Sequence, residues 1–483
     1  MSSFIQTVVM KFNSIEFWLF FSFVILSYRF LPQKSQNRLL LVAGYVFYSS
    51  WDWRFLPLLW ISTVVDYILS RILHRSSEHS TRVVVIAGSI AVNLGVLGLF
   101  KYYDFFTVEI VRIANYLGAD FASCTLGLAL PVGISFYSLQ KLGYLLDVYY
   151  RRNEPPANIF DFALYTCFFP IILSGPIERS THLMPQILAP RAIKQSDISE
   201  ALYHIFSGLF RKVVLADNLA PIVNLIFSTD PQALSGPECL AGMYLYTFQI
   251  YFDFSGYSHI AQGVAKLMGF DVMWNFKMPY FASTPSEFWN RWHISLSSWI
   301  RDYLYIPLGG NRLGKVRTLT NLTITMLLVG LWHGAAWNFV VWGMFHGCLL
   351  VAYRIIELWG CKRNTASISA SCIGHCLKVF ILFNLIAVGW LLFRSDSILQ
   401  ASVMLWRGLT DFNTTSLFYY SLISGAVYVL PMIIFEAWIF RSGDVLIFSR
   451  KKWYVQGLVY GLVTIFLMIF QPVGSSEFIY FRF

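Results

Sequence analysis

The chain has 483 residues, of which 57% are hydrophobic and only 13% are charged. Soluble globular domains carry nearly twice that charged fraction, so this composition excludes an ordinary soluble protein and indicates a membrane protein. The formal net charge of +10 would suggest a nucleic-acid partner in a soluble protein. Here the positive residues lie in short loops between apolar runs. They are better explained by the orientation of the chain in a membrane, and we expect no nucleic-acid partner.

Apolar runs recur along nearly the whole chain, and each approaches or reaches the roughly 20 residues that a helix needs to cross a bilayer. Because these runs are continuous and do not alternate with polar residues, they predict helices and not a β-barrel. We therefore predict an all-α, polytopic membrane protein with about 11 to 13 transmembrane or re-entrant helices. The clearest runs are residues 17–31, 55–73, 83–100, 379–393, 417–440 and 455–470.

The first run lacks a preceding basic segment and a small-residue cleavage site, so it is interpreted as the first span and not as a signal peptide. Basic residues gather at 34–38, 71–82, 151–152, 211–212, 312–317 and 450–452. If these segments face the cytoplasm, the N-terminus lies outside. The last run then delivers a tail, residues 471–483, to the extracytoplasmic side. With no soluble domain, linker or clear repeat, we predict a single membrane domain over residues 1–483.

One stretch breaks the pattern of apolar runs. Residues 283–317 are aromatic and charged, and they are too polar to span a bilayer. Their tryptophans and tyrosines nevertheless require burial or an interface. We therefore predict an amphipathic or re-entrant segment that lines a water-accessible cavity. The following apolar stretch, residues 327–347, carries His333 among leucine, tryptophan, glycine and alanine.

His333 is the first candidate for chemistry, because an ionisable residue inside a membrane segment is costly and therefore suggests a function. A buried, neutral imidazole can take a proton from a hydroxyl, which suits a general base in acyl transfer. The alternative is a histidine that packs between helices and bonds a carbonyl. His293, on the polar segment, could approach His333 and orient or polarise a donor carbonyl. In one continuous helix His346 would lie about 20 Å from His333, so we expect it to take no part in the same step.

Other polar residues have weaker support as functional groups. We expect solvated or structural roles for His74, His79, His182, His204 and His375. Cys372 and Cys376 flank His375 but have no partner cluster, so packing in a membrane helix is favoured over metal binding. Two clusters of polar residues lie in apolar surroundings. Each is explained equally well by hydrogen bonds between helices and by a role in lining a site. The first contains Asp253, Ser255, Tyr257 and His259, and the second contains Ser135, Gln140, Lys141 and Asp147.

Several motifs, in order, resemble the membrane-bound O-acyltransferase family, specifically its bacterial alginate-acetylation type. RWHISLSSWIRDYLYIPLGGNR at 291–312 is similar to the family signature, and LWHGAAWNFVVWG at 331–343 resembles its catalytic-histidine motif. FDFSGYS at 252–258, LPVGISFYSLQ at 130–140 and FFPIILSGPIER at 168–179 also look like this type. The resemblance implies that His333 is the catalytic histidine and His293 the second polar residue of the active site. It also implies a central tunnel with both residues near its middle.

The sequence departs from the family pattern at three positions. His259 stands where the family usually has an acidic residue, Asn290 replaces a common arginine, and Glu178 replaces an apolar residue. None of these departures removes a catalytic group. His259 is a candidate for a different contact with the donor or the acceptor.

The sequence ends in FIYFRF, residues 478–483. This resembles an aromatic ending with a central tyrosine in bacterial envelope-acylation systems, where the tyrosine is proposed to carry the acyl group as a phenolic ester. A phenol leaves more readily than an alkyl alcohol, so such an ester remains activated. We therefore favour Tyr480 as an acyl carrier over the alternative, an aromatic anchor at the membrane interface.

These features predict a multi-pass protein of the bacterial cytoplasmic (inner) membrane that moves acetyl groups from cytoplasmic acetyl-CoA toward a cell-envelope or exported polysaccharide. Arg312, Lys315 and Arg317 are candidate contacts for the donor nucleotide, and no metal is expected. An extracytoplasmic acyltransferase or esterase-like partner would take the acetyl group to the polysaccharide, for which alginate and peptidoglycan are both compatible. One alternative is a carrier-protein thioester donor, as in teichoic-acid D-alanylation. The other is a polysaccharide or lipid transporter, which should show a repeat symmetry that we do not find.

Overall fold

The computed structural model describes residues 9–360, 372–471 and 479. Within these residues every regular element is helical and none is a strand, which confirms the predicted all-α fold. Five helical segments of the described chain are long and apolar enough to cross a membrane, so the polytopic prediction is confirmed. They are Gln33–Arg75, His79–Tyr116, Trp337–Leu358, Ile373–Arg394 and Ser416–Ser442. The total of about 11 to 13 spanning and re-entrant segments, like the central tunnel, stays a prediction.

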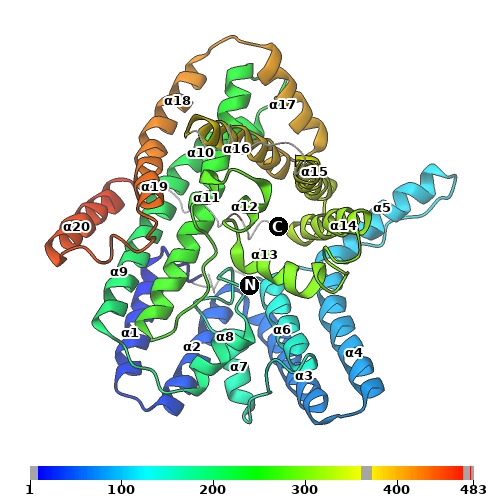
Figure 1. The fold of residues 1–483 in the computed structure, drawn as a ribbon, viewed down its shortest axis with the longest axis vertical. Helices are drawn as coiled ribbons and strands as arrows, with labels where there is room; N and C mark the ends of the chain where they lie inside the picture. The colour runs from blue at the N-terminus through cyan, green and yellow to red at the C-terminus, as the bar shows by residue number, and fades with distance from the viewer. Residues whose placement is uncertain (1–8, 361–371, 472–478, 480–483) are drawn as a thin grey trace, which may run out of the picture. The chain divides into compact units, whose positions relative to one another are not determined.

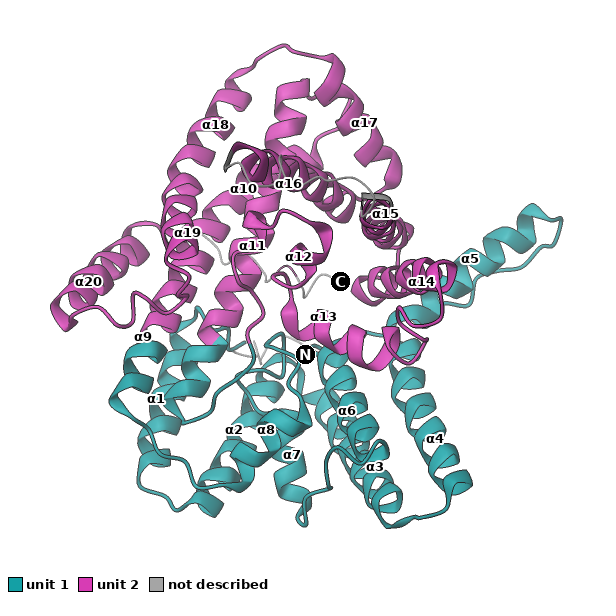
Figure 2. Ribbon diagram, in the orientation of Figure 1, with its two compact units in different colours: residues 1–201, 261–273 teal, residues 202–260, 274–483 magenta. Residues whose placement is uncertain are grey.

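The chain divides into two compact units (Figure 2). Unit 1 contains residues 1–201 and 261–273, and unit 2 contains residues 202–260 and 274–483. Helices α9 (Gln195–Leu209) and α11 (Gly236–Leu267) each contribute residues to both units. This division does not test the predicted single domain.

Unit 1 is built of helices (Figure 2). A buried ion pair ties its helices together: Lys141 of α6 lies 2.9 Å from Asp66 of α3, measured from Nζ to Oδ2. The other carboxylate oxygen of Asp66 accepts a hydrogen bond from Asn93 of α4 at 2.9 Å. Charges in an apolar bundle persist when they are paired in this way. The elements are α1 (Ile15–Arg29), α2 (Gln33–Asp52), η1 (Trp53–Phe55), α3 (Leu56–Arg75), α4 (His79–Leu97), the π-helical turn η2 (Gly98–Tyr102), α5 (Tyr103–Tyr116), α6 (Ile134–Tyr149), α7 (Ile159–Cys167) and α8 (Ser180–Leu188).

Unit 2 contains the remaining helices and all the catalytic candidates that the structure describes (Figures 1 and 2). Its π-helical turn η3 (Phe210–Ala216) directly continues α9. The other elements are α10 (Asp217–Ser228), η4 (Pro279–Phe281), α12 (Pro285–Trp289), α13 (Ile294–Ile300), the π-helical turn η5 (Arg301–Tyr305), α14 (Lys315–His333), α15 (Trp337–Gly360), α16 (Cys372–Arg394), α17 (Ile398–Thr410), α18 (Ser416–Tyr428), α19 (Leu430–Ser442) and α20 (Trp453–Ile469).

Two apolar runs are interrupted at points that hydropathy does not reveal. The run 417–440 forms α18 and α19, which separate at Val429 just before Pro431. Proline lacks an amide N–H and its ring clashes with the carbonyl four residues earlier, so the first helix ends there. The run 327–347 is likewise divided after His333, where Gly334 takes an extended conformation with φ −163° and ψ 151°.

Glycines allow α14 and α15 to pack unusually closely. A Cβ added to Gly330 would lie 2.3 Å from the carbonyl oxygen of Phe339, and one added to Gly343 would lie 2.4 Å from that of Met326. Any larger side chain would separate the helices. Small residues at such a contact are typical of helix pairs in membranes, where close van der Waals packing drives association.

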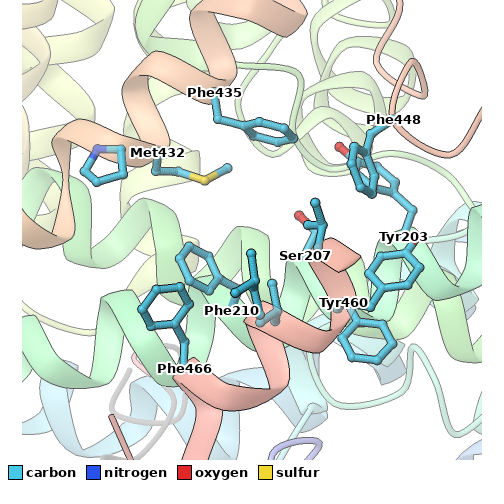
Figure 3. Close-up of a pocket in the computed structure, with 13 residues that line it drawn as sticks. Tyr203, Ser207, Phe210, Met432, Phe435, Phe448, Tyr460 and Phe466 are labelled. Carbon is cyan, nitrogen blue, oxygen red and sulfur yellow. The ribbon is translucent and has the colours of Figure 1, made fainter. Parts of the chain in front are cut away.

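An apolar cavity of about 270 Å³ is lined by residues of α9, η3, α19 and α20, with Phe448 from the loop before α20 (Figure 3). Aromatic side chains make up most of its wall, with Phe210, Phe435 and Phe466 among them. Its lining includes no histidine, carboxylate or amine. The titratable groups of this wall are the phenols of Tyr203 and Tyr460, and the histidine candidates lie elsewhere in unit 2.

Candidate active site

His333 is the last residue of α14, and only 3% of its surface is exposed. Gly334 ends the helix directly after it. Three aromatic rings surround the imidazole: the ring centroids of Trp332, Trp342 and Phe393 lie 4.9, 5.0 and 5.4 Å from that of His333. All three pack edge-on, so the imidazole is held in one orientation by shape. The structure thus places His333 in a largely apolar environment formed by three aromatic rings.

His346 lies much closer to His333 than a continuous helix would allow. The chain reverses after Gly334, and α15 packs back against α14. Both imidazoles contact Trp342, with centroid distances of 5.0 Å for His333 and 4.7 Å for His346. The expected separation of about 20 Å along one helix is therefore wrong, because the stretch 327–347 forms a helical hairpin. That His346 takes no part in the chemistry stays a prediction.

His293 is held in a strained backbone conformation. Its φ of 42° and ψ of 53° lie in the left-handed region, which is costly for a residue with a side chain. Asn275 fixes this turn: its backbone carbonyl accepts from the Ile294 amide at 2.9 Å, and its Oδ1 accepts from the Ser295 hydroxyl at 2.6 Å. The Asn275 amide also donates to Ser258 of α11 at 3.1 Å. Strain that neighbours hold in place in this way is common at functional sites.

The helix before this turn begins with a strong local signal. Thr284 caps α12 by accepting from the Glu287 amide at 3.1 Å, and Pro285 occupies the first helical position. Glu287 in turn accepts from the Ser283 amide at 2.8 Å and pairs with Arg291 at 2.9 Å. This arrangement is a variant of the capping box. With α12, α13 and η5 all short, the non-spanning character predicted for residues 283–317 is confirmed.

The structure brings the two predicted histidines to a shared tryptophan. The Trp332 ring lies 6.1 Å from His293 and 4.9 Å from His333, centroid to centroid. Phe254 of α11 also contacts His293, at 4.8 Å. His293 has no exposed surface, and burial lowers the pKa of His293 to about 3. Its imidazole is therefore neutral at physiological pH and can donate or accept a hydrogen bond.

A buried cluster of charges includes Asp253, the residue before Phe254 on α11. Lys212 of η3 is 2.8 Å from Asp217 and 2.6 Å from Asp253, measured from Nζ to a carboxylate oxygen in each pair. Its neighbour Arg211 pairs with Glu436 at 2.8 Å. Arg211 and Lys212 are each only 3% exposed. The interpretation of 211–212 as a basic loop that reports topology is therefore wrong, since buried carboxylates balance both charges.

The last described residue of the chain reaches this charge cluster. Ile479 is 8% exposed, and its backbone N–H donates to the Oδ2 of Asp253 at 2.8 Å. Asp253 directly precedes Phe254, whose ring contacts His293. Tyr480 lies outside the described residues, so its predicted role as acyl carrier is not tested. The residue immediately before it is nevertheless bound to Asp253, whose neighbour Phe254 contacts His293.

A cavity of about 280 Å³ extends along α14 toward His333. Val329, the lining residue closest to His333 in sequence, is about 6 Å from it along the helix axis. Thr325, one turn earlier, is 6% exposed, and within the described chain its hydroxyl has no hydrogen-bond partner. A buried hydroxyl in this state is costly, so the wall suits a ligand with a polar group. The other polar lining residues are Ser286, Asn290, Ser297, Ser298, Arg301 and Tyr305.

The three cations predicted to hold the donor nucleotide lie at the opposite end of α14 from His333. Arg312, Lys315 and Arg317 are all exposed. Lys315 begins the helix that His333 ends, which places the two about 27 Å apart along the axis. The cavity lies alongside the part of α14 between them. Their role in donor binding stays a prediction.

The polar clusters of the two units differ in what they contact. In the first cluster, Asp253 binds Lys212 and Ile479, while His259 lies 2.8 Å from His204, Nδ1 to Nδ1. In the second, Gln140 bonds the Tyr165 carbonyl at 2.7 Å. This second cluster joins helices of unit 1, whereas His293 and His333 belong to unit 2. The first cluster is therefore the one that reaches the site.

Sequence reasoning did not identify Asn275 and Lys212 as residues of the site. Asn275 carries no motif, and only its burial against the His293 turn reveals its role. The sequence did not show that Lys212 is buried, because an Arg–Lys pair between apolar runs is also typical of a cytoplasmic loop. A carboxylate five residues later, Asp217, was the available hint of an internal ion pair.

The chain matches the model of the membrane-bound O-acyltransferase family over residues 45–387. This range is more than half of the chain and includes both His293 and His333. The protein therefore belongs to the membrane-bound O-acyltransferase family. It is a multi-pass membrane protein and an O-acyltransferase, as the motifs predicted, and the transporter alternative is set aside.

The chain is also similar to proteins with named activities. A probable alginate O-acetylase of Pseudomonas aeruginosa is 37% identical over 84% of this chain and 76% of the relative. A peptidoglycan O-acetyltransferase of Helicobacter pylori is 33% identical over 86% of this chain and 82% of the relative. A teichoic acid D-alanyltransferase of Streptococcus thermophilus is 31% identical, but over only 54% of this chain and 68% of the relative.

Proposed function

We propose that this protein takes acetyl groups from cytoplasmic acetyl-CoA and places them on Tyr480, from which an extracytoplasmic partner passes them to a polysaccharide. The observation that carries the proposal is the contact between Ile479 and Asp253, because it anchors the residue before Tyr480 in the same unit as the histidines. From Asp253 the site is reached through Phe254, which contacts His293. The residue next to Tyr480 and the two histidines therefore belong to one unit, which supports the proposal.

In the proposed reaction His333 acts as the general base. Its ring nitrogen takes the phenolic proton of Tyr480, and the phenolate oxygen attacks the thioester carbonyl of the donor. The C–S bond breaks as the C–O bond of the acetyl ester forms, and the imidazolium returns the proton to the leaving thiolate. Neutral His293 donates a hydrogen bond to the carbonyl oxygen as negative charge develops on it. The products are acetylated Tyr480 and CoA with a free thiol.

The cavity along α14 supports the donor half of this proposal. An extended thioester arm there would run from the exposed cations near Lys315 toward His333 at the other end of the helix. Thr325 would bond an amide of the arm. We expect Thr325→Val to raise the KM for acetyl-CoA several-fold, because the arm then loses its partner. Thr320→Val is the matched control, since the Thr320 hydroxyl is exposed and bonds the carbonyl of Val316 at 3.1 Å.

The acceptor is proposed to be a polysaccharide or peptidoglycan, as the names of two relatives indicate for those proteins. The second step would move the acetyl group from the tyrosine ester to a sugar hydroxyl and regenerate the phenol. An acyltransferase or esterase-like partner outside the membrane would catalyse that step and set the choice of polymer. No metal enters the proposal.

Labelling with radioactive acetyl-CoA tests the proposal directly. Purified wild-type protein should acquire covalent label, and both His333→Ala and Tyr480→Phe should remove it. Label that survives Tyr480→Phe would refute the relay while leaving the enzyme an acyltransferase.

One alternative donor keeps support from the comparisons. The similarity to a D-alanyltransferase covers 54% of this chain and makes a carrier-protein thioester the alternative donor. If wild-type protein takes no label from acetyl-CoA but takes label from an acylated carrier protein, the donor proposed here is wrong. The use of Tyr480 would then be tested with that donor.

A further inference from the structure

We propose that Asp253 is a docking residue for the chain's own tail. Its carboxylate binds the backbone N–H of Ile479 and so fixes the point from which Tyr480 extends. The docking contact stands without the relay, whereas its consequence for acetyl transfer rests on the proposed function. Asp253 does not need to touch substrate in this role, so it is a positioning residue.

The carboxylate of Asp253 is divided between two partners. Its Oδ1 lies 2.6 Å from Lys212 Nζ, and its Oδ2 accepts from Ile479 at 2.8 Å. Lys212 is itself held from the other side by Asp217 at 2.8 Å. The lysine therefore orients the carboxylate, and the second oxygen remains available for a backbone amide. A bond from an amide to a charged acceptor is among the stronger hydrogen bonds in proteins.

The contact between Asp253 and Ile479 is buried and does not lie on the protein surface. Asp253 is 2% exposed and Ile479 is 8% exposed. Residues near a chain end are usually poorly ordered unless something ties them down. The hydrogen bond from the Ile479 amide to the buried Asp253 carboxylate holds this residue in place.

The same region also holds the other end of the tail. Asn218, the residue after Asp217, donates from its side chain to the carbonyl of Phe470 at 3.0 Å, where α20 ends. Residue 470 is thus bound by Asn218 at the start of α10, and residue 479 by Asp253 of α11.

Trimming with carboxypeptidase Y tests the docking in the full-length protein, with intact mass recorded over time. In the wild type we expect trimming to slow sharply at Ile479. In Asp253→Ala it should pass Ile479 at least about tenfold faster, as the loss of a hydrogen bond to a charged group predicts. Asp217→Ala is the matched control: it also removes one partner of Lys212 but keeps the Asp253 carboxylate that accepts from the Ile479 amide, so trimming should match the wild type.

A graded variant covers the case in which Asp253→Ala does not fold. Asp253→Asn keeps the size and an acceptor oxygen but turns a charge-assisted bond into a neutral one, so trimming should be intermediate. Wild-type trimming in every folded Asp253 variant would overturn the docking proposal. Equal acceleration in the Asp253 and Asp217 variants would also overturn it, because general loosening of the ion cluster would then explain the effect.

The functional consequence is measured separately from docking. In single-turnover acetylation, Asp253→Asn should lower the rate of label transfer to the tail while the KM for acetyl-CoA stays unchanged. A merely structural loss would raise KM and lower the rate together. If trimming responds as expected but no label ever reaches Tyr480, the docking stands and the relay fails. If trimming does not respond, the docking fails whatever the label shows.

Discussion

His333 and His346 form a matched pair of residues, because both are buried and both imidazoles contact Trp342. We expect His333→Ala to lower the rate of acetyl transfer by at least about 100-fold, the usual contribution of a general base. His346→Ala should cost less than about tenfold, since its expected role is packing. Initial rates with labelled donor measure both. Equal losses in the two variants would mean that the aromatic packing around Trp342, and not proton transfer, sustains activity.

His182 makes the stability of unit 1 depend on pH. Its Nδ1 lies 2.8 Å from Glu178, and this hydrogen bond raises the pKa of His182 above its ordinary value of 6.5. Because the raised pKa belongs to the folded state, the charged ring stabilises the fold fully below pH 6.5. That stability is lost as the pH rises through the raised value. Asp271, 3.9 Å from Nε2, adds to the effect.

Melting temperatures in detergent test this prediction. From pH 6.5 upward the wild type should lose thermal stability, whereas His182→Gln, which cannot titrate, should follow a flatter curve. The same slope in both proteins would show that another group controls the pH dependence.

Two departures from the family pattern have histidine partners within the chain. Glu178 bonds His182, and His259 lies against His204 at 2.8 Å. Two Nδ1 atoms at that distance require a proton on one ring and a lone pair on the other. These partners give each departure a structural setting. The expected contact of His259 with donor or acceptor remains a prediction.

At the scale of elements, the α14–α15 hairpin positions His333 through its glycines. Gly330→Ala would place a Cβ 2.3 Å from the carbonyl of Phe339, so the helices must separate. Overpacking of this kind costs about 1–3 kcal/mol, and we expect a clear drop in melting temperature. Activity should fall with it, because His333 lies one turn away. Gly457→Ala on α20 meets no atom within 4 Å and should be neutral or stabilising by about 0.5–1 kcal/mol.

A Gly330→Ala protein as stable and active as the wild type would contradict the close packing of the hairpin. A Gly457→Ala protein that loses as much stability would point instead to a general intolerance of alanine at helical glycines. Melting curves and initial rates of both variants, recorded in the same detergent, separate these outcomes.

The elements also show where sequence reasoning succeeds and where it stops. Continuous apolar runs predicted helices correctly, because hydropathy reports burial in lipid or protein. It does not report chain reversal, so the single residue Gly334, which divides 327–347, escaped notice. The motifs identified His293 and His333, but the contacts that hold His293 come from Asn275, distant in sequence and without a pattern of its own. Long-range pairs such as Ile479 with Asp253 are set by tertiary structure alone.

For the whole molecule, orientation in the membrane decides whether the relay can work. Arg211 and Lys212 do not indicate which side of the membrane their segment faces, because both side chains are buried in ion pairs. The cations at 312, 315 and 317 and those at 450–452 are exposed and continue to favour a cytoplasmic location for their segments. The cations near Lys315 would then meet the donor inside the cell. The tail beyond α20 would lie on the outer side.

Cysteine labelling in intact cells tests this orientation, in a protein whose seven natural cysteines are replaced by serine. A cysteine at Lys315 should react with a membrane-impermeant maleimide only after the cells are permeabilised, and so should one at Lys452. A cysteine added after Phe483 should react in intact cells. Labelling of all three positions from the same side would place donor and tail together. Acetyl groups would then not cross the membrane on Tyr480, and an extracytoplasmic partner could not unload them.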